Sequence, residues 1–228
     1  MNPYLPLIYA HRGASFDYPE MSKEAYLAAV DQGADGFETD LRITKDRQII
    51  CWHDADLKRI ANSEIVIAKS THQEIRAAYP VLTLEELLEI AIVHRKNLAL
   101  ETKHPNPSGG AVERELIRVL DKYREQISDS GISISIMSFS WWALFRVRSA
   151  SYQRVYLMNF HWQRLLSRSL ALGPSVSTLG RLKRESVGSK IFVWTANTES
   201  EIRLCQSKRV DVMMTDRPAF ARAILENV

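Results

Sequence analysis

The chain has 228 residues, of which 46% are hydrophobic and 25% are charged. These values are typical of a globular protein, and the length fits one large α/β domain over residues 1–228. The net charge of +3 is too small and too scattered to indicate nucleic-acid binding. A weak positive bias would help to attract an anionic small-molecule substrate, but the need for solubility explains it equally well.

Cysteine usage and the N-terminal segment both favour a cytoplasmic protein. The two cysteines, Cys51 and Cys205, form no disulfide framework and no zinc motif, which is typical of a reducing compartment. Residues 1–5 lead directly into a short apolar run without the pattern of a signal peptide. No segment approaches the roughly 18 apolar residues of a membrane span, so we expect no stable membrane insertion. The oligomeric state stays open.

Short β-branched or aromatic runs alternate with helical patterns along the chain. Eight strands are predicted: Leu7–Ala10, Gly36–Asp40, Leu98–Glu101, Ser133–Met137, Arg154–Leu157, Ser175–Thr178, Ile191–Thr195 and Asp211–Thr215. Eight helices are predicted to start near Ser22, Thr83, Gly110, Trp141, Trp162, Leu179, Glu199 and Pro218. This alternation predicts an α/β fold, a (β/α)₈ TIM barrel. An open doubly wound sheet is the alternative, but the first strand is followed by no Gly-rich phosphate loop.

Residues 41–82 depart from the alternation. Leu41–Ile43 and Gln48–Trp52 are separated by only four residues, whereas parallel strands need a connection of a dozen or more. We therefore expect a hairpin that returns the chain, with His53, to the level of the second strand's end. Residues 56–80 would then form a small insertion on the catalytic rim.

Three carboxylates end apolar strands of the predicted barrel. Glu38 and Asp40 have the period-two spacing that places both on one face of a strand, and Glu101 ends the next strand. A carboxylate is costly to bury unless it is paired or bound to a metal. Since the strand ends meet at one mouth, the three acids indicate a hard divalent cation, Mg²⁺ or Ca²⁺.

Two histidines are predicted at the same mouth. His11 ends the first strand and His53 follows the hairpin. Histidine titrates near neutral pH, so two of them can serve as acid and base in one reaction. Arg12 adds a planar donor group suited to phosphate oxygens. Together with the carboxylates, these residues favour metal-assisted cleavage of a phosphate ester.

The order and spacing of the motifs resemble the glycerophosphodiester phosphodiesterase family across nearly the whole chain. The segments that carry the resemblance are Ala10–Ala14, Pro19–Glu20, Gly33–Asp40, Thr44–Asp46, His53–Arg59, Leu82–Leu88, Leu100–Lys103, Ser138–Phe139, Trp194–Asn197 and Thr215–Pro218. The resemblance implies a barrel of the phospholipase C-like phosphodiesterase type. It also implies hydrolysis of glycerophosphodiesters to sn-glycerol 3-phosphate and an alcohol.

The resemblance also implies a role for each site residue. Glu38, Asp40 and Glu101 would hold the divalent cation, His11 and His53 would be the acid–base pair, and Arg12 and Lys103 would bind the phosphoryl oxygens. Trp194 ends a predicted strand, and from that position it would either line the glycerol side of the pocket or fill the top of the barrel. A neighbouring glycerol hydroxyl can act as nucleophile in this family, giving a cyclic phosphate that water opens. Which histidine is the acid, which metal binds and which alcohol is preferred all stay open.

The chain departs from the family pattern at Met21, where the family usually has Asn, which puts local positioning near the mouth in question. Asp54 has no assigned role, and Glu20 is a weaker candidate for a supporting one. The remaining histidines have no acidic partner in any motif and are interpreted as surface or packing residues: His72, His94, His104 and His161.

Two other functions remain as alternatives. A phosphodiesterase acting on lysophospholipids or sphingolipids would need an apolar rim, for which residues 56–80 offer little material. A non-catalytic barrel that binds phosphodiesters would not need both an acid and a base.

Overall fold

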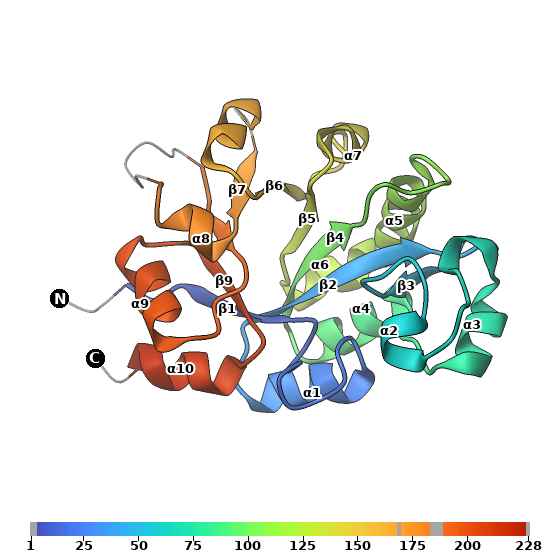
Figure 1. Ribbon diagram of the computed structural model, residues 1–228, viewed down its shortest axis with the longest axis horizontal. Coiled ribbons are helices and arrows are strands. Elements are labelled where there is room, and N and C mark those ends of the chain that lie inside the picture. Colours follow the sequence, from blue (N-terminus) through green and yellow to red (C-terminus); the bar gives the residue numbers. More distant parts are fainter. Residues whose placement is uncertain (1–3, 168–169, 183–188, 227–228) are drawn as a thin grey trace.

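A computed structural model describes residues 4–167, 170–182 and 189–226. Eight parallel strands follow one another around a barrel in the order β7-β6-β5-β4-β2-β1-β9-β8, with helices outside them (Figure 1). Parallel bridges from Leu172 to Ile191 and from Ser175 to Trp194 join β7 to β8. The barrel is thus nearly closed, which confirms the predicted TIM-barrel fold. The strands are β1 (Leu7–His11), β2 (Gly36–Ile43), β3 (Ile49–Cys51), β4 (Asn97–Thr102), β5 (Ile134–Ser138), β6 (Gln153–Met158), β7 (Ala171–Pro174), β8 (Phe192–Val193) and β9 (Val212–Thr215).

The helices begin largely where the sequence predicts. Ser22, Thr83 and Thr198 each accept a backbone hydrogen bond as N-caps, and Thr83 and Glu86 form a capping box. The α-helices are α1 (Lys23–Asp31), α2 (Lys58–Ala61), α3 (His72–Ala78), α4 (Leu84–Val93), α5 (Ala111–Lys122), α6 (Arg124–Ser130), α7 (Trp141–Arg146), α8 (Val176–Leu179), α9 (Glu199–Ser207) and α10 (Pro218–Glu226); η1 (Ile67–Lys69) and η2 (His161–Leu166) are 3₁₀ helices. In this described part of the chain, no helix has the length and hydrophobicity to cross a bilayer.

The predicted hairpin is confirmed. β3 pairs antiparallel with the end of β2, and the Trp52 N–H donates to the Asp40 carbonyl at 2.9 Å. The following residues, which include α2, η1 and α3, pack on a small hydrophobic cluster around Trp52 and Leu57. This cluster fixes the segment on either side of His53 and therefore the position of the histidine at the mouth.

The barrel interior is filled by alternate side chains from most of its strands. Tyr9, Met137, Leu157, Phe192 and Met214 belong to one buried cluster. A second set of hydrophobic side chains packs the outer face of the strands against the helices. Interior and exterior positions alternate along each strand, so Glu101, two residues after the interior Ala99, also faces the inside of the barrel.

The predicted strand Ser175–Thr178 is wrong. The seventh strand is β7, residues 171–174, and Ser175 is the N-cap of α8, whose side chain accepts from the Thr178 N–H. Gly173 on β7 faces Leu157, where an added Cβ would lie 2.6 Å from a side-chain carbon. The strand therefore needs the glycine for close packing inside the barrel.

Three further boundaries differ from the prediction. The helix expected near Trp162 is the 3₁₀ helix η2, and the strand expected over residues 191–195 is shortened to β8. The helix expected from Leu179 is replaced by the earlier α8; the rest of that prediction falls partly on residues 183–188, outside the described residues.

Candidate active site

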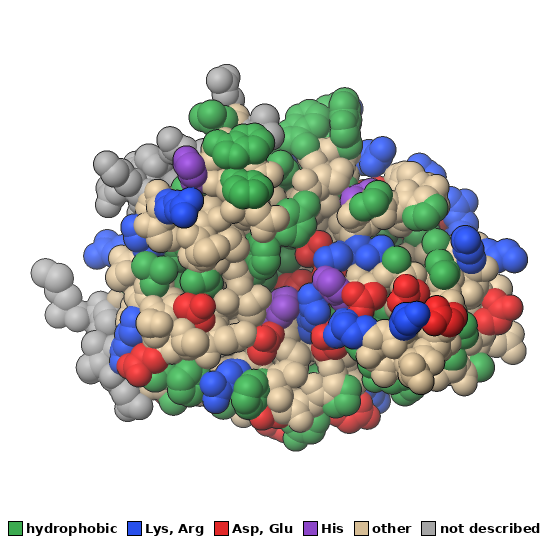
Figure 2. Space-filling model, in the orientation of Figure 1, with side chains coloured by type: hydrophobic (Ala, Val, Ile, Leu, Met, Phe, Trp, Pro, Cys, Tyr) green, Lys and Arg blue, Asp and Glu red, His purple; other side chains and the backbone are tan. Residues whose placement is uncertain are grey.

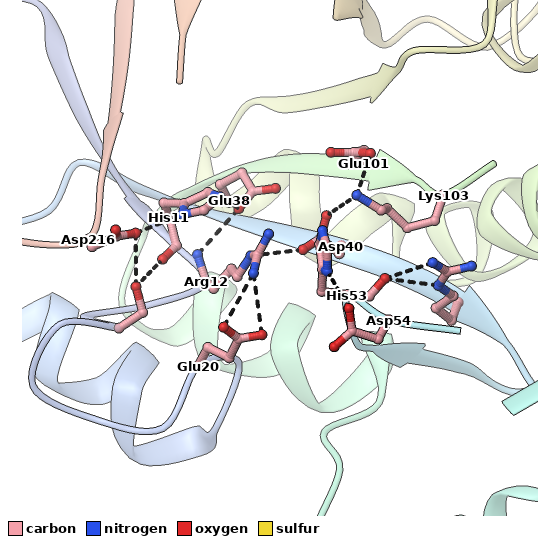
Figure 3. Close-up of polar contacts among 12 residues, drawn as sticks. His11, Arg12, Glu20, Glu38, Asp40, His53, Asp54, Glu101, Lys103 and Asp216 are labelled. Carbon is pink, nitrogen blue, oxygen red and sulfur yellow. Dashed lines mark hydrogen bonds and ion pairs between the residues drawn. The ribbon is translucent and has the colours of Figure 1, made fainter. Parts of the chain in front are cut away.

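The C-terminal ends of the strands enclose a pocket of about 250 Å³. Its lining includes seven of the eight predicted site residues: His11, Arg12, Glu38, His53, Glu101, Lys103 and Trp194. The eighth, Asp40, contacts two of the lining residues and is 1% exposed. The fold therefore brings together residues from β1, β2, the hairpin, β4 and β8, as Figure 3 shows for the polar members.

Glu38, Asp40 and Glu101 form one buried carboxylate cluster. Each offers an oxygen, and these oxygens lie within 4.8 Å of one another. Burial and the charge of Asp40 raise the pKa of Glu38 to about 8 and that of Glu101 to about 7. Asp40 Oδ2 is buried and accepts no well-aligned hydrogen bond in the described residues. Three carboxylates that each offer an oxygen donor within this short distance fit a hard divalent cation.

Arg12 and Lys103 share the Asp40 carboxylate. Arg12 Nε lies 3.0 Å from one oxygen, and Lys103 Nζ lies 3.1 Å from the other and 2.9 Å from Glu101 Oε1. Burial alone would raise the pKa of Asp40, but the charges of Lys103 and Arg12 lower it below its usual value. Both cations border the pocket, where they can also reach an anionic substrate.

His11 is held by a residue from the far end of the chain. Its Nδ1 lies 2.7 Å from Asp216 Oδ1, just beyond β9 (Figure 3). Asp216 also accepts from the Ser15 hydroxyl and the Asn197 amide. Burial alone would lower the pKa of His11, but the charges of Glu38 and Asp216 raise it. Asp216 lies in the matching segment Thr215–Pro218, but no role could be predicted for it from the sequence, because only barrel closure brings it to His11.

His53 has an equivalent partner from its own segment. Its Nδ1 lies 2.8 Å from Asp54 Oδ1, and the Arg42 guanidinium donates to its backbone carbonyl at 2.7 and 3.1 Å. Burial lowers the pKa of His53, with a smaller opposite effect from Asp40. Asp54, unassigned from the sequence, thus has a defined contact.

Glu20 links the two sides of the mouth. Its carboxylate lies 3.3 Å from Arg12 Nη1 and 2.5 Å from Arg59 Nη2, and Arg59 also binds Asp54 at 2.6 Å. An ion-pair chain therefore runs from Arg12 to the partner of His53. The neighbouring Met21 is buried in the hydrophobic core, while its N–H donates to the Arg12 carbonyl at 2.8 Å. Its side chain is thus directed away from the polar contacts of the site.

The opposite wall of the pocket is apolar. The Trp194 indole N–H donates to the Gly173 carbonyl at 2.8 Å, and its ring meets Phe139 edge-on at 5.5 Å. Met137, Leu157 and Met214 complete this wall. A substrate in the pocket would meet charged groups on one side and hydrocarbon on the other.

One histidine interpretation requires correction. His104 does have an acidic partner, since its Nε2 lies 2.5 Å from Oε1 of the buried Glu113 on α5. No motif in the sequence indicated this pair, because the two residues meet only when the loop after β4 folds back onto α5.

The sequence matches the glycerophosphoryl diester phosphodiesterase family over residues 11–220. The Mycobacterium tuberculosis protein named "Probable glycerophosphodiester phosphodiesterase 1" is 28% identical over 97% of this chain and 93% of its own length. A glycerophosphodiester phosphodiesterase of Bacillus subtilis is 34% identical over 91% of this chain and 75% of its own length.

Solved structures show the same fold. A phosphodiesterase of Oleispira antarctica, in complex with the product sn-glycerol-3-phosphate, has a TM-score of 0.85 at 22% identity and covers 98% of both chains. The glycerophosphodiester phosphodiesterase of Thermotoga maritima has a TM-score of 0.76 at 23% identity, covering 96% of this chain and 98% of its own. Because the sequence match extends from β1 to α10, this chain belongs to the glycerophosphoryl diester phosphodiesterase family, a family of hydrolases.

Proposed function

We propose that the protein hydrolyses glycerophosphodiesters to sn-glycerol 3-phosphate and an alcohol, with a divalent cation and a histidine acid–base pair. The observation that carries the proposal is the meeting of His11, His53 and the three-carboxylate cluster around one pocket. The product bound to the Oleispira antarctica relative is the one this reaction would release.

Glu38, Asp40 and Glu101 would hold Mg²⁺ or Ca²⁺, since all three offer oxygen donors. The bound cation would polarise the phosphoryl group and lower the pKa of an adjacent hydroxyl or water. Arg12 and Lys103 would orient the phosphoryl oxygens through charge-assisted hydrogen bonds. The apolar wall around Trp194 would exclude water from the far side of the substrate.

The two histidines would move protons at opposite ends of the reaction. One would take the proton from the attacking water or glycerol hydroxyl, and the other would protonate the departing alkoxide. Asp216 and Asp54 each occupy the Nδ1 side of a ring, which leaves Nε2 of His11 and His53 for the substrate. A protein that only binds phosphodiesters would have no use for two histidines oriented in this way.

The protein is proposed to act in the cytoplasm as one domain over residues 1–228. Both cysteines are free and buried, which supports a reducing compartment.

The experiment is to incubate the purified protein with glycerophosphocholine and with glycerophosphoethanolamine, each with EDTA, Mg²⁺ or Ca²⁺. Release of sn-glycerol 3-phosphate that EDTA abolishes and one of the cations restores is the expected result. His11→Ala and His53→Ala should each remove most of the turnover. No release with any cation, or near-normal turnover in both variants, would contradict the proposal.

A further inference from the structure

Large hydrophobic side chains are exposed beside the mouth of the barrel. α7 follows the C-terminal end of β5 and η2 follows that of β6, so both lie at the end of the barrel that holds the pocket. Figure 2 shows hydrophobic side chains protruding at the upper edge, over α7 and over the segment after β6 in Figure 1. We call this set the rim patch: Phe139, Trp141, Trp142, Phe145, Phe160, Trp162 and Leu165.

The side chains of the rim patch are large and hydrophobic, yet they are exposed to solvent. Trp142 is 64% exposed, Trp162 55% and Leu165 68%. The rings contact one another instead of entering the core: Trp141 stacks on Phe145 with centroids 5.3 Å apart, and Phe160 stacks on Trp162 at 6.5 Å. Large apolar side chains that gather on a surface mark sites of interaction.

The segment that contains the rim patch has basic residues but no acidic ones. Between Asp129 and Glu185 the sequence has eight Lys and Arg residues and no Asp or Glu. Within the described residues, Arg148 is exposed, with its guanidinium 3.8 Å from the Phe145 ring centroid. Arg181, which follows α8, is also exposed. Exposed aromatic side chains on a stretch of sequence whose only charged residues are basic are complementary to an anionic lipid surface.

The rim patch reaches the pocket at one residue. Phe139 belongs to both, and its ring meets Trp194 at the apolar wall. Phe139 therefore connects the exposed side chains that follow β5 to the hydrocarbon side of the pocket. A surface that covered the rim patch would lie directly against the pocket opening.

We propose that the protein docks on anionic phospholipid bilayers through the rim patch, with the pocket opening turned toward the headgroups. The contact is peripheral, because it uses aromatic side chains on a short helix and a 3₁₀ turn. This inference concerns where the protein binds and does not depend on the proposed reaction, so each can fail alone.

The test is co-sedimentation of the full chain with vesicles of phosphatidylcholine and with vesicles in which about one third of the lipid is phosphatidylglycerol. We expect binding to the anionic vesicles, much weaker binding to the neutral ones, and a decrease as salt increases. Blue-shifted tryptophan emission on binding would report the transfer of indoles into the interface.

Variants test the surface itself. Trp142→Ser combined with Trp162→Ser should lower the vesicle partition coefficient at least about tenfold, since each ring would lose its apolar contact with the lipid. Leu165→Ser should give a smaller loss in the same direction. Val93→Ser is the matched control: Val93 is 74% exposed, but it ends α4 just before β4 begins, at the opposite end of the barrel. It should bind as the unmodified protein does.

Three results would overturn the proposal. One is the absence of binding to anionic vesicles by the unmodified protein, and another is equal binding by the double variant. The third is sedimentation equilibrium showing a dimer that the double variant abolishes, without vesicle binding, which would assign the rim patch to a second copy of the chain. Thermal unfolding of each variant controls for loss of the fold.

Discussion

Asp216 Oδ1 lies 2.7 Å from His11 Nδ1, although the two residues are separated by almost the entire chain. Asp54 holds the same position on His53, at 2.8 Å. The pKa of each aspartate is lowered: burial raises it, but the hydrogen bond with the histidine and further polar partners outweigh that effect. Since an ionised carboxylate can only accept, Nδ1 carries the proton in both rings, and both histidines present Nε2 in the same tautomer.

Replacing Asp216 should disturb catalysis more than binding. In Asp216→Asn the tautomer and orientation of His11 are no longer fixed, so we expect kcat for release of sn-glycerol 3-phosphate to fall about 100-fold with a small change in KM. Ser15→Ala is the control, because it removes the hydrogen bonds of the Ser15 hydroxyl to Asp216 and to the His11 backbone carbonyl but keeps the contact between Asp216 and the His11 ring. Unchanged kcat in Asp216→Asn would show that His11 does not need this partner.

Asp54→Asn should also lower kcat, but by less, about tenfold, because His53 is more exposed than His11. Arg59→Met separates two explanations, since it removes the ion pair to Asp54 while leaving the Asp54–His53 contact in place. We expect Arg59→Met to retain most of the activity. Equal losses in the two variants would mean that the ion-pair chain through Glu20, and not the histidine partner, is what matters.

Glu101→Gln should weaken binding of the proposed cation. The variant removes one charged oxygen donor from the cluster, so we expect the dissociation constant for Mg²⁺ or Ca²⁺, measured by calorimetry, to rise at least about tenfold. Glu113→Gln is a matched control, because Glu113 is also a buried glutamate but pairs with His104 outside the cluster. An equal loss of cation affinity in both variants would argue against the assigned ligands.

Glu86 should make the stability of the fold depend on pH. Burial raises the pKa of its carboxyl, but hydrogen bonds from the Thr83 N–H and Arg76 outweigh this and lower it below its usual value of 4.5. The carboxylate therefore stabilises the folded state above that pH, and the contribution is lost as pH falls through the lowered folded pKa. Relative to Glu86→Gln, the free energy of unfolding in urea should be higher by about 0.5 kcal/mol near neutral pH and should converge in acid. A difference that does not change with pH would contradict this.

Two glycines separate backbone strain from steric overlap. Gly13 and Gly131 both have positive φ, of 83° and 72°. An added Cβ at Gly13 would lie 2.7 Å from the Ala25 backbone, whereas at Gly131 nothing lies within 4 Å. Gly131→Ala should therefore lower the free energy of unfolding by about 1–2 kcal/mol, because alanine is strained in the left-handed conformation. Gly13→Ala should lower it by more, because steric overlap adds to the same strain. Equal losses in chemical denaturation would show that α1 moves aside without penalty.

The sequence was sufficient for the features that depend on local pattern. The hairpin followed from a connection too short for parallel strands, and the helix starts near Thr83 and Glu199 followed from the change in hydrophobic pattern. The strand β7 was not predicted, because its local sequence pattern is misleading. Its Gly173 and Pro174 have the local signal of a turn, while the β-branched residues after Ser175 have that of a strand. Tertiary packing against Leu157 overrides both signals.

The proposed site residues could be selected because motif order identifies strand ends, but their partners could not. Asp216 lies near His11 only because β9 pairs with β1, and Arg59 reaches Glu20 only after the hairpin has folded. The rim patch was also missed, because an aromatic run after a strand has the same pattern whether it packs or protrudes. These contacts depend on closure of the barrel and not on spacing.

The pairing of β9 with β1 has a consequence for biosynthesis. A nascent chain emerging from the ribosome would already contain the three proposed cation ligands and both histidines once the first 103 residues were made. His11 would nevertheless lack its partner until residue 216 had been translated and the last strand had docked against the first. The nascent chain would therefore become active only at the end of its synthesis. Hydrolysis by a newly made chain would indicate that its barrel is complete.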